Sequence, residues 1–354
     1  MPTRSHLPRR MFVSAAVASA ALPQALRAAD QNTKTTLRFG AYLAPVSHTV
    51  TRIINPWIKG IESDSQSRIG FDLYTGGSLG RSPYAQFDLL RAGVADVAFV
   101  QPPYTTGQFK QLQILETPLL VRNSTEASLV AWELYRRGLV QGFEDVHVLG
   151  FWTAEPGVVF SRLPVSGLDD LKNLKVRSAG RLEGDFIESL GATAESMHPT
   201  DVYEALRRHT IDATVQGLVA VNTFQAYRVS THVINAPFGV VSFALLMNKR
   251  AWEKLPTDLQ EVITLHSGQR LSLLGGNSYD TRVAEIDKKF RANPALTYVE
   301  PSAHDIERLQ DAVKPLVDAW VARTPKGAET YEAVKDILAN MRSIERPSGV
   351  ERAS

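Results

Sequence analysis

The chain of 354 residues carries 39 basic and 37 acidic side chains and contains no cysteine. This length is enough for one large or two medium domains, and the near balance of charge leaves no basic footprint for nucleic acid. The absence of cysteine excludes disulfides and thiolate metal sites.

The first 29 residues have the pattern of an export signal. Arg4, Arg9 and Arg10 precede an apolar run over residues 11–22, and small residues follow it. The run is shorter than the ~20 apolar residues that span a membrane. The pair Arg9-Arg10 favours a twin-arginine signal, with a general secretory signal as the alternative. We therefore expect a periplasmic protein whose signal peptide covers residues 1–29.

Strand and helix patterns alternate along the rest of the chain. The expected strands cover residues 37–42, 71–75, 96–101, 146–152, 174–177, 211–216, 233–236 and 243–247. The expected helices cover residues 49–63, a segment from Ser82, and residues 123–137, 183–190, 200–208 and 219–227. This alternation predicts an α/β fold with mostly parallel sheets, in which ligands bind at the ends of the strands.

From Thr257 onward the pattern is helical. Two capping pairs are expected to open these helices, Thr257 with Gln260 and Ser302 with Asp305. The pair Gly275-Gly276 should weaken the first helical run, and Pro315 should kink or break the second.

A change of domain near residues 152–162 and a return near Phe243 predict two lobes joined by crossing strands. The first lobe is expected to comprise residues 30–154 and 243–282. The second is expected to comprise residues 155–242 and 283–345, with a flexible tail over 346–354.

No catalytic set accompanies this frame. The loop Gly76–Gly80 matches the G-x-S-x-G nucleophile elbow, with Ser78 as the nucleophile of a secreted hydrolase. An elbow serine turns straight into a helix, whereas here the helix signal at Ser82-Pro83 comes four residues later. The histidines show neither an i, i+4 pair nor an HExxH motif, and the chain has no Walker loop and no GxGxxG. We expect no metal, no cofactor and no enzyme, and keep the hydrolase as a minor alternative.

The strand over residues 174–177 ends on Arg177, which the small residues Ser178, Ala179 and Gly180 follow. A guanidinium beside backbone with little side-chain cover can hold a carboxylate through two parallel hydrogen bonds. Trp152 ends a strand at the expected domain change, where it lines either a cleft or a core. Together with the export signal, these features favour a ligand-binding protein that closes like a hinge.

Several segments, in this order and spacing, resemble the solute-binding proteins of TRAP-type (tripartite ATP-independent periplasmic) transporters. They are Pro45–His48, Gly77–Gly80, Leu89–Asp96, Gln101–Tyr104, Leu168–Arg177, Leu190–Ala192, Asp201–Arg208, Ile211–Ala213 and Met247–Lys249. The resemblance covers nearly all of the chain after the signal. It implies a two-lobed α/β periplasmic-binding-protein fold of a type II-like kind, with the cleft between the lobes and long helices near the C-terminus. It also implies delivery of an organic acid to a membrane permease, without catalysis.

In this resemblance the arginine that binds the ligand's carboxylate falls on Arg177. Other positions that should contact the ligand or face the cleft are Tyr42, His48, Gln101, Tyr104, Trp152, Pro199, Gln216 and Phe238. Sialic-acid-type members carry a second arginine twenty residues before the first, and here that position is Gly157. One arginine suits one carboxylate, so we expect a monocarboxylate with an apolar or aromatic body. We expect a monomer, and a ligand sensor for a membrane receptor remains an alternative to transport.

Overall fold

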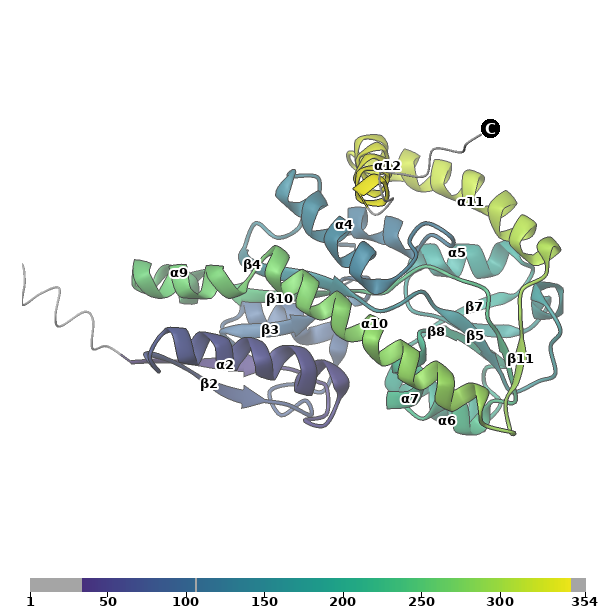
Figure 1. The fold of residues 1–354 in the computed structure, drawn as a ribbon, viewed down its shortest axis with the longest axis horizontal. Helices are drawn as coiled ribbons and strands as arrows, with labels where there is room; N and C mark the ends of the chain where they lie inside the picture. Colours follow the sequence, from purple (N-terminus) through teal and green to yellow (C-terminus); the bar gives the residue numbers. More distant parts are fainter. Residues whose placement is uncertain (1–33, 106, 345–354) are drawn as a thin grey trace, which may run out of the picture.

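The computed structural model describes residues 34–105 and 107–344 and places them in two α/β lobes (Figure 1). The expected signal peptide and the expected flexible tail lie outside the described residues. Within the described part, no helix combines the length and the apolar character that crossing a bilayer needs.

The first lobe contains a five-stranded sheet in the order β2-β1-β3-β10-β4. Strand β10 runs antiparallel to both of its neighbours, whereas β1 is parallel to β2 and to β3. Because β10 comes late in the sequence and inserts between β3 and β4, the chain returns to the first lobe there. The strands are β1 (Thr35–Gly40), β2 (Ile69–Tyr74), β3 (Val97–Val100), β4 (Val146–Thr153) and β10 (Ser242–Asn248).

Helices cover both faces of this sheet. A π-helical turn, Val50–Ile54, runs directly into α2, and the apolar stripe of this predicted helix is buried, including Trp57. Asn123 caps α4, because its Oδ1 accepts a hydrogen bond of 2.8 Å from the backbone N of Glu126, as the sequence predicts. The helices of this lobe are α2 (Asn55–Asp64), α3 (Gln86–Arg91), α4 (Ser124–Arg136), α8 (Lys249–Glu253) and α9 (Thr257–His266).

The expected capping box at the start of α9 is wrong. Pro256 occupies the cap position and Thr257 is already the first helical residue, so no side chain caps this helix. The side chain of Gln260 instead donates a hydrogen bond of 2.9 Å to the backbone oxygen of Trp252.

The second lobe contains a six-stranded sheet in the order β11-β9-β5-β8-β6-β7. Strand β5 is antiparallel to both neighbours, and the other pairs are parallel. The sequence analysis missed β5, β7 and β11. Strand β5 is buried along its whole length and shows no alternation, and the other two are short, partly exposed edge strands. The strands are β5 (Val158–Ser161), β6 (Lys175–Ser178), β7 (Thr193–Ser196), β8 (Ala213–Gln216), β9 (His232–Ile234) and β11 (Thr297–Val299).

The helices of the second lobe are α5 (Arg181–Ser189), α6 (Pro199–Arg207), α7 (Leu218–Thr223) and α11 (Ala303–Arg323). The capping box that the sequence predicts at Ser302 and Asp305 is confirmed: each side chain accepts a hydrogen bond from the other residue's backbone N, at 3.1 Å and 2.8 Å. Pro315 does not break α11, which continues to Arg323.

Two short segments cross between the lobes side by side. The backbone N of Ala154 donates to the oxygen of Val241, and that of Gly157 donates to the oxygen of Gly239. A Cβ added to Gly239 would lie 2.0 Å from the carbonyl carbon of Glu116, so only glycine fits where these segments pass that residue.

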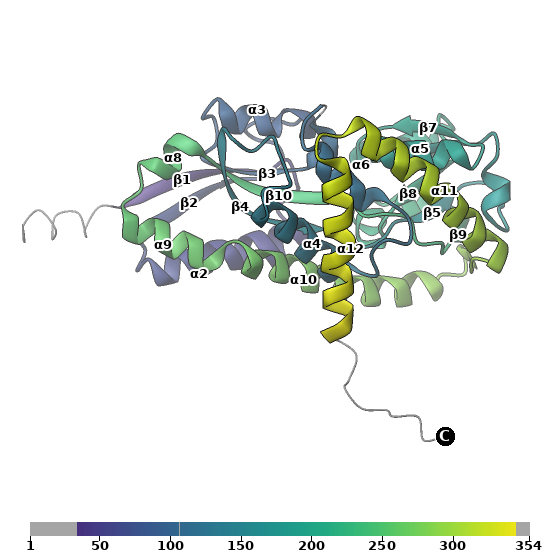
Figure 2. The same ribbon diagram turned by 90° about the horizontal axis from the view of Figure 1, so that it is seen from above.

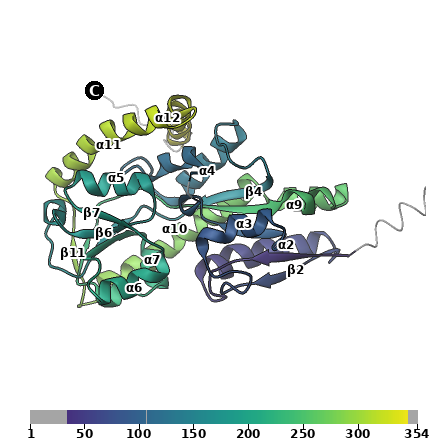
Figure 3. The same cartoon turned by 180° about the vertical axis from the view of Figure 1, so that it is seen from behind.

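The long helix α10 (Gln269–Arg291) also links the lobes, along which it runs in Figure 2. Gly275 and Gly276 do not interrupt it. They let it approach the first lobe, since an added Cβ would lie 2.4 Å from the Cβ of Trp152 and 2.5 Å from the Cα of Thr125. The last helix, α12 (Gly327–Ile344), packs on α4 (Figure 3). The sequence analysis places all of residues 283–345 in the second lobe, whereas α12 packs on α4 of the first lobe.

Candidate functional site

A cavity lies between the two lobes, where the ends of several strands converge. Its volume is about 70 Å³. Seven of the nine predicted site residues line it, because they lie at or just after strand ends or in the loops between the lobes. These seven are Tyr42, His48, Gln101, Tyr104, Arg177, Pro199 and Gln216.

The other two predicted residues do not line the cavity. Trp152 is fully buried behind its aromatic wall, with ring centroids 5.6 Å from Phe99 and 5.9 Å from Phe243. Phe238 is buried in the core of the second lobe. Trp152 therefore supports the cavity wall from behind.

Arg177, on β6, is 2% exposed, and all of its hydrogen-bond partners are neutral. Its Nε donates to the backbone oxygen of Met197 at 2.9 Å, Nη1 donates to that of Val215 at 3.0 Å, and Nη2 donates to the hydroxyl of Tyr104 at 2.9 Å. No ion pair joins it to a carboxylate among the residues that the structure describes. Since a guanidinium has five N–H groups, each Nη keeps one N–H for a further acceptor.

Polar groups from both lobes surround this guanidinium. The side-chain amide of Gln216, on β8, is buried, and neither its Oε1 nor its Nε2 has a hydrogen-bond partner within the described ranges. Across the cavity, the hydroxyl of Tyr42 donates to Oε1 of Gln101. Because a buried amide without partners costs free energy, Gln216 is suited to hydrogen bonding with a bound molecule.

The sequence analysis missed His198, which lies next to this polar end. Its ring packs against Tyr42 and Tyr104, with centroids 4.9 Å and 5.0 Å apart. Burial, with a smaller contribution from the positive charge of Arg177, lowers the pKa of His198 to about 3. The imidazole is therefore neutral, and its Nδ1 is 2.8 Å from the hydroxyl of Thr200.

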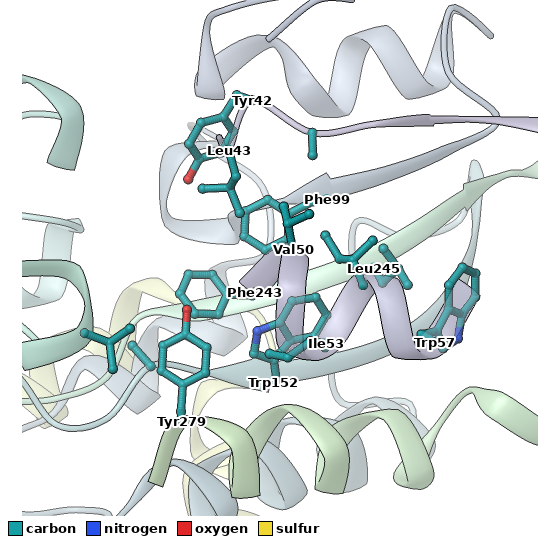
Figure 4. Packing of buried hydrophobic residues seen from close by; sticks show 14 of the residues in the cluster. Tyr42, Leu43, Val50, Ile53, Trp57, Phe99, Trp152, Phe243, Leu245 and Tyr279 are labelled. Atoms are coloured by element: carbon teal, nitrogen blue, oxygen red, sulfur yellow. The ribbon is translucent and has the colours of Figure 1, made fainter. Parts of the chain in front are cut away.

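One wall of the cavity is a row of aromatic rings. Centroids lie 5.8 Å apart between Tyr42 and Phe99, 5.5 Å between Phe99 and Phe243, and 5.7 Å between Phe243 and Tyr279. Figure 4 shows the row, with Tyr42 and Tyr279 at its two ends. Tyr279 comes from α10, so no local sequence signal connects it with a strand-end site.

Two buried carboxyl groups lie beside the crossing segments. Oε2 of Glu116 accepts a hydrogen bond of 3.1 Å from the backbone N of Glu183, and Oε2 of Glu183 accepts one of 2.5 Å from the backbone N of Ala179. Burial raises the pKa of Glu116 to about 8 and that of Glu183 to about 7. The mutual repulsion of the two acids raises the pKa of Glu116 further, whereas Arg177 opposes the rise for Glu183.

Ser78 lies apart from the cavity. Its side chain is exposed in a turn, and its hydroxyl donates to the backbone oxygen of Thr75 at 3.1 Å, with no histidine or acid of the described part of the chain bonded to it. The described residues also contain no group of three or more histidine or acidic side chains placed to hold a metal ion.

Comparisons with known proteins identify similar chains. The family model described as bacterial extracellular solute-binding protein, family 7, matches residues 39–324. The outer membrane transporter protein TsaT of Comamonas testosteroni is 27% identical over 330 residues, which cover 89% of this chain and 94% of that protein.

Solved structures share the fold. A TRAP solute-binding protein of Rhodoferax ferrireducens, in complex with copurified benzoate, has a TM-score of 0.83 at 24% identity, covering 88% of this chain and 100% of that one. A marine metagenome TRAP solute-binding protein specific for aromatic acid ligands, in complex with 3-hydroxybenzoate, has a TM-score of 0.82 at 23% identity, covering 87% and 99%. The two-lobed α/β arrangement is thus the fold of TRAP solute-binding proteins.

Proposed function

The chain belongs to the family 7 bacterial extracellular solute-binding proteins, and on this premise we propose that it captures an aromatic monocarboxylate through Arg177 and delivers it to a membrane permease. The family consists of periplasmic binding proteins of TRAP transporters and not of enzymes.

The observation that carries the proposal is the buried charge of Arg177. A guanidinium remains protonated in a protein, so this residue keeps its positive charge although its bonded partners are neutral. A carboxylate in the cavity would compensate the charge and bind the free N–H groups of both Nη atoms. Because burial and the positive charge of Arg177 keep His198 neutral, the guanidinium supplies the positive charge at this end of the cavity.

The shape of the cavity favours one carboxylate on a compact aromatic body. The row of four rings offers a flat apolar wall beside the arginine, and aromatic pairs contribute ~0.5–1.5 kcal/mol beyond their buried area. The apolar character of this wall favours an aromatic acid over a sugar acid. The benzoate bound by the Rhodoferax ferrireducens protein is an acid of this kind.

The two lobes supply complementary parts of the site. Arg177, Pro199 and Gln216 come from the second lobe, whereas the aromatic row and Gln101 come from the first. A ligand that touches both lobes stabilises the closed arrangement relative to an open one. The hydrogen bond between Arg177 and Tyr104 already joins the lobes in the structure.

Calorimetric titration of the protein with benzoate tests the proposal. Replacing Arg177→Ala should weaken binding by about 2–5 kcal/mol, or roughly 30- to 5,000-fold, because it removes one partner of a buried charge pair. Arg181→Ala is the matched control, since this nearby arginine has an exposed side chain. Unchanged affinity of the Arg177→Ala variant, or no binding of any aromatic monocarboxylate by the wild type, would refute the proposal.

A further inference from the structure

A buried pair of hydroxyl groups stands at the end of the aromatic row away from the polar end of the cavity. Oγ1 of Thr49 lies 2.9 Å from Oη of Tyr279, and both residues line the cavity. The side chains are buried, at 4% and 5% exposure. In Figure 4, Tyr279 and Tyr42 lie on opposite sides of Phe99 and Phe243. The cavity therefore has a polar group at each end of an apolar wall.

The pair has hydrogen-bonding capacity left over. Two hydroxyls hold two protons and four lone pairs, and the bond between them uses one of each. Neither hydroxyl has another hydrogen-bond partner among residues 34–105 and 107–344. One proton and three lone pairs thus remain for a molecule in the cavity. Burial raises the pKa of Tyr279, so its hydroxyl keeps its proton at physiological pH.

The hydroxyl of Thr49 differs from that of Thr51, two residues later, in that it makes no local hydrogen bond to the backbone of the described residues. The hydroxyl of Thr51 donates to the backbone oxygen of Ser47 at 2.9 Å, which is the usual local bond of a helical threonine. The hydroxyl of Thr49 makes no bond to the backbone and points instead to Tyr279. Thr49 directly precedes the π-helical turn Val50–Ile54, and such turns are frequent at functional sites.

The position of Tyr279 is fixed from behind. The ring of His48 packs edge-on against that of Tyr279, with centroids 5.3 Å apart. Nε2 of His48 lies 3.0 Å from Oγ and 3.2 Å from the backbone oxygen of Ser278, one residue before Tyr279 on α10. A pre-positioned hydroxyl pair can discriminate between ligands, because a polar group held in a buried place penalises an apolar atom opposite it.

We propose that the Thr49–Tyr279 hydroxyl pair recognises a hydrogen-bonding substituent on the ring of the bound acid. The preferred ligands are then aromatic monocarboxylates that carry a hydroxyl on the side of the ring away from the carboxylate. This inference rests on the proposed function, because Arg177 must hold the carboxylate for the opposite edge of the ring to face the pair.

Isosteric ligand pairs test the inference. Dissociation constants are measured by calorimetry for 3- and 4-hydroxybenzoate and for 3- and 4-methylbenzoate, which fill nearly the same space. In the wild type, at least one hydroxybenzoate should bind about tenfold more tightly than its methyl counterpart, the effect of one net hydrogen bond. Thr49→Val and Tyr279→Phe should each bring this ratio close to one. Thr51→Val, two residues away, should leave it unchanged.

The outcomes separate the inference from the proposed function. If the methylbenzoates bind as tightly as both hydroxybenzoates, or if the ratio survives both Thr49→Val and Tyr279→Phe, the hydroxyl pair does not read the ring. If none of the benzoates binds, the proposed function fails, and the inference fails with it. Thermal melting of each variant establishes that it is folded, and because the readout is a ratio within one variant, partial loss of folded protein does not alter it.

Discussion

Arg177 and the Glu116–Glu183 pair are both buried and ionisable, yet the arginine stays charged whereas burial favours the neutral form of the acids. Arg177 is bonded to two backbone oxygens and one hydroxyl and stays positive. Glu116 is bonded to a backbone N and holds its proton to about pH 8, because burial disfavours the charged form. Arg177 keeps its charge without a bonded carboxylate, whereas burial favours the neutral form of Glu116.

The difference separates the proposed binding site from a structural joint, formed by Glu116 and Glu183 where Glu116 meets the crossing segment at Gly239. A carboxyl group can escape the cost of burial by binding a proton, whereas a guanidinium has no such route and is relieved only by an anion. Gln216 resembles Arg177 in this respect, because its buried amide also lacks hydrogen-bond partners among the described residues. Unsatisfied polar groups of Gln216 thus line the cavity, whereas at the joint near Gly239 burial keeps Glu116 protonated.

The largest expected effect is on stability and concerns the joint. Gly239→Ala would place a Cβ 2.0 Å from the carbonyl carbon of Glu116, which the crossing segments cannot accommodate without moving. We expect a loss of about 3 kcal/mol or more in the free energy of unfolding. Urea denaturation measures it, with Gly70→Ala as the control, because there the nearest atom is 4.0 Å away. A variant as stable as wild type would show that the joint is not tightly packed.

The next effect depends on pH. The pKa of Glu116 rises from 4.5 to about 8 on folding, so the folded protein binds this proton more tightly. Its stabilising contribution is fully present below pH ~4.5 and is lost as the pH rises through 8. Glu116→Gln, which mimics the protonated acid, should therefore gain up to about 4 kcal/mol over wild type between pH 5 and pH 9.

Denaturant unfolding at pH 5, 7 and 9 gives the measurement for Glu116→Gln. Glu133→Gln is the opposite control, because Arg136 and Arg137 lower the pKa of that partly exposed acid to about 2, and its loss should show no gain at high pH. A constant difference between wild type and Glu116→Gln across this range would contradict a buried, protonated Glu116.

The smallest expected effect concerns the buried amide of Gln216 in the cavity, compared with the buried amide of Gln111. Gln216→Met removes an amide that has no partners, so the unliganded protein should be equally stable or about 1 kcal/mol more stable. Its affinity for benzoate should fall by about 1–2 kcal/mol, or roughly 5- to 30-fold. Gln111→Met is the contrast: this equally buried amide donates to the backbone oxygen of Pro325 at 2.9 Å, and its loss should destabilise the protein. If Gln216→Met destabilises the unliganded protein as much as Gln111→Met does, the contrast between the two amides fails.

Local rules predicted the parts of the molecule whose physics is local. The apolar stripe before and within α2, the Asn123 cap of α4 and the Ser302–Asp305 capping box depend on residues within a few positions of one another, and they appear as predicted. The Thr257–Gln260 pair failed because Pro256 took the cap position, a choice between neighbouring residues that residue types alone leave open. Strand β5 was missed because a strand buried on both faces has no alternation to detect.

By itself, the sequence determined the α/β class, the family and the strand-end position of Arg177, because these follow from patterns along the chain. Only the tertiary structure decided that the partners of Arg177 are neutral, that Trp152 lies behind the cavity wall, and that Thr49 meets Tyr279. Thr49 and Tyr279 are 230 positions apart in the sequence. Contacts of this kind arise from the packing of α10 against both lobes, which no local pattern encodes.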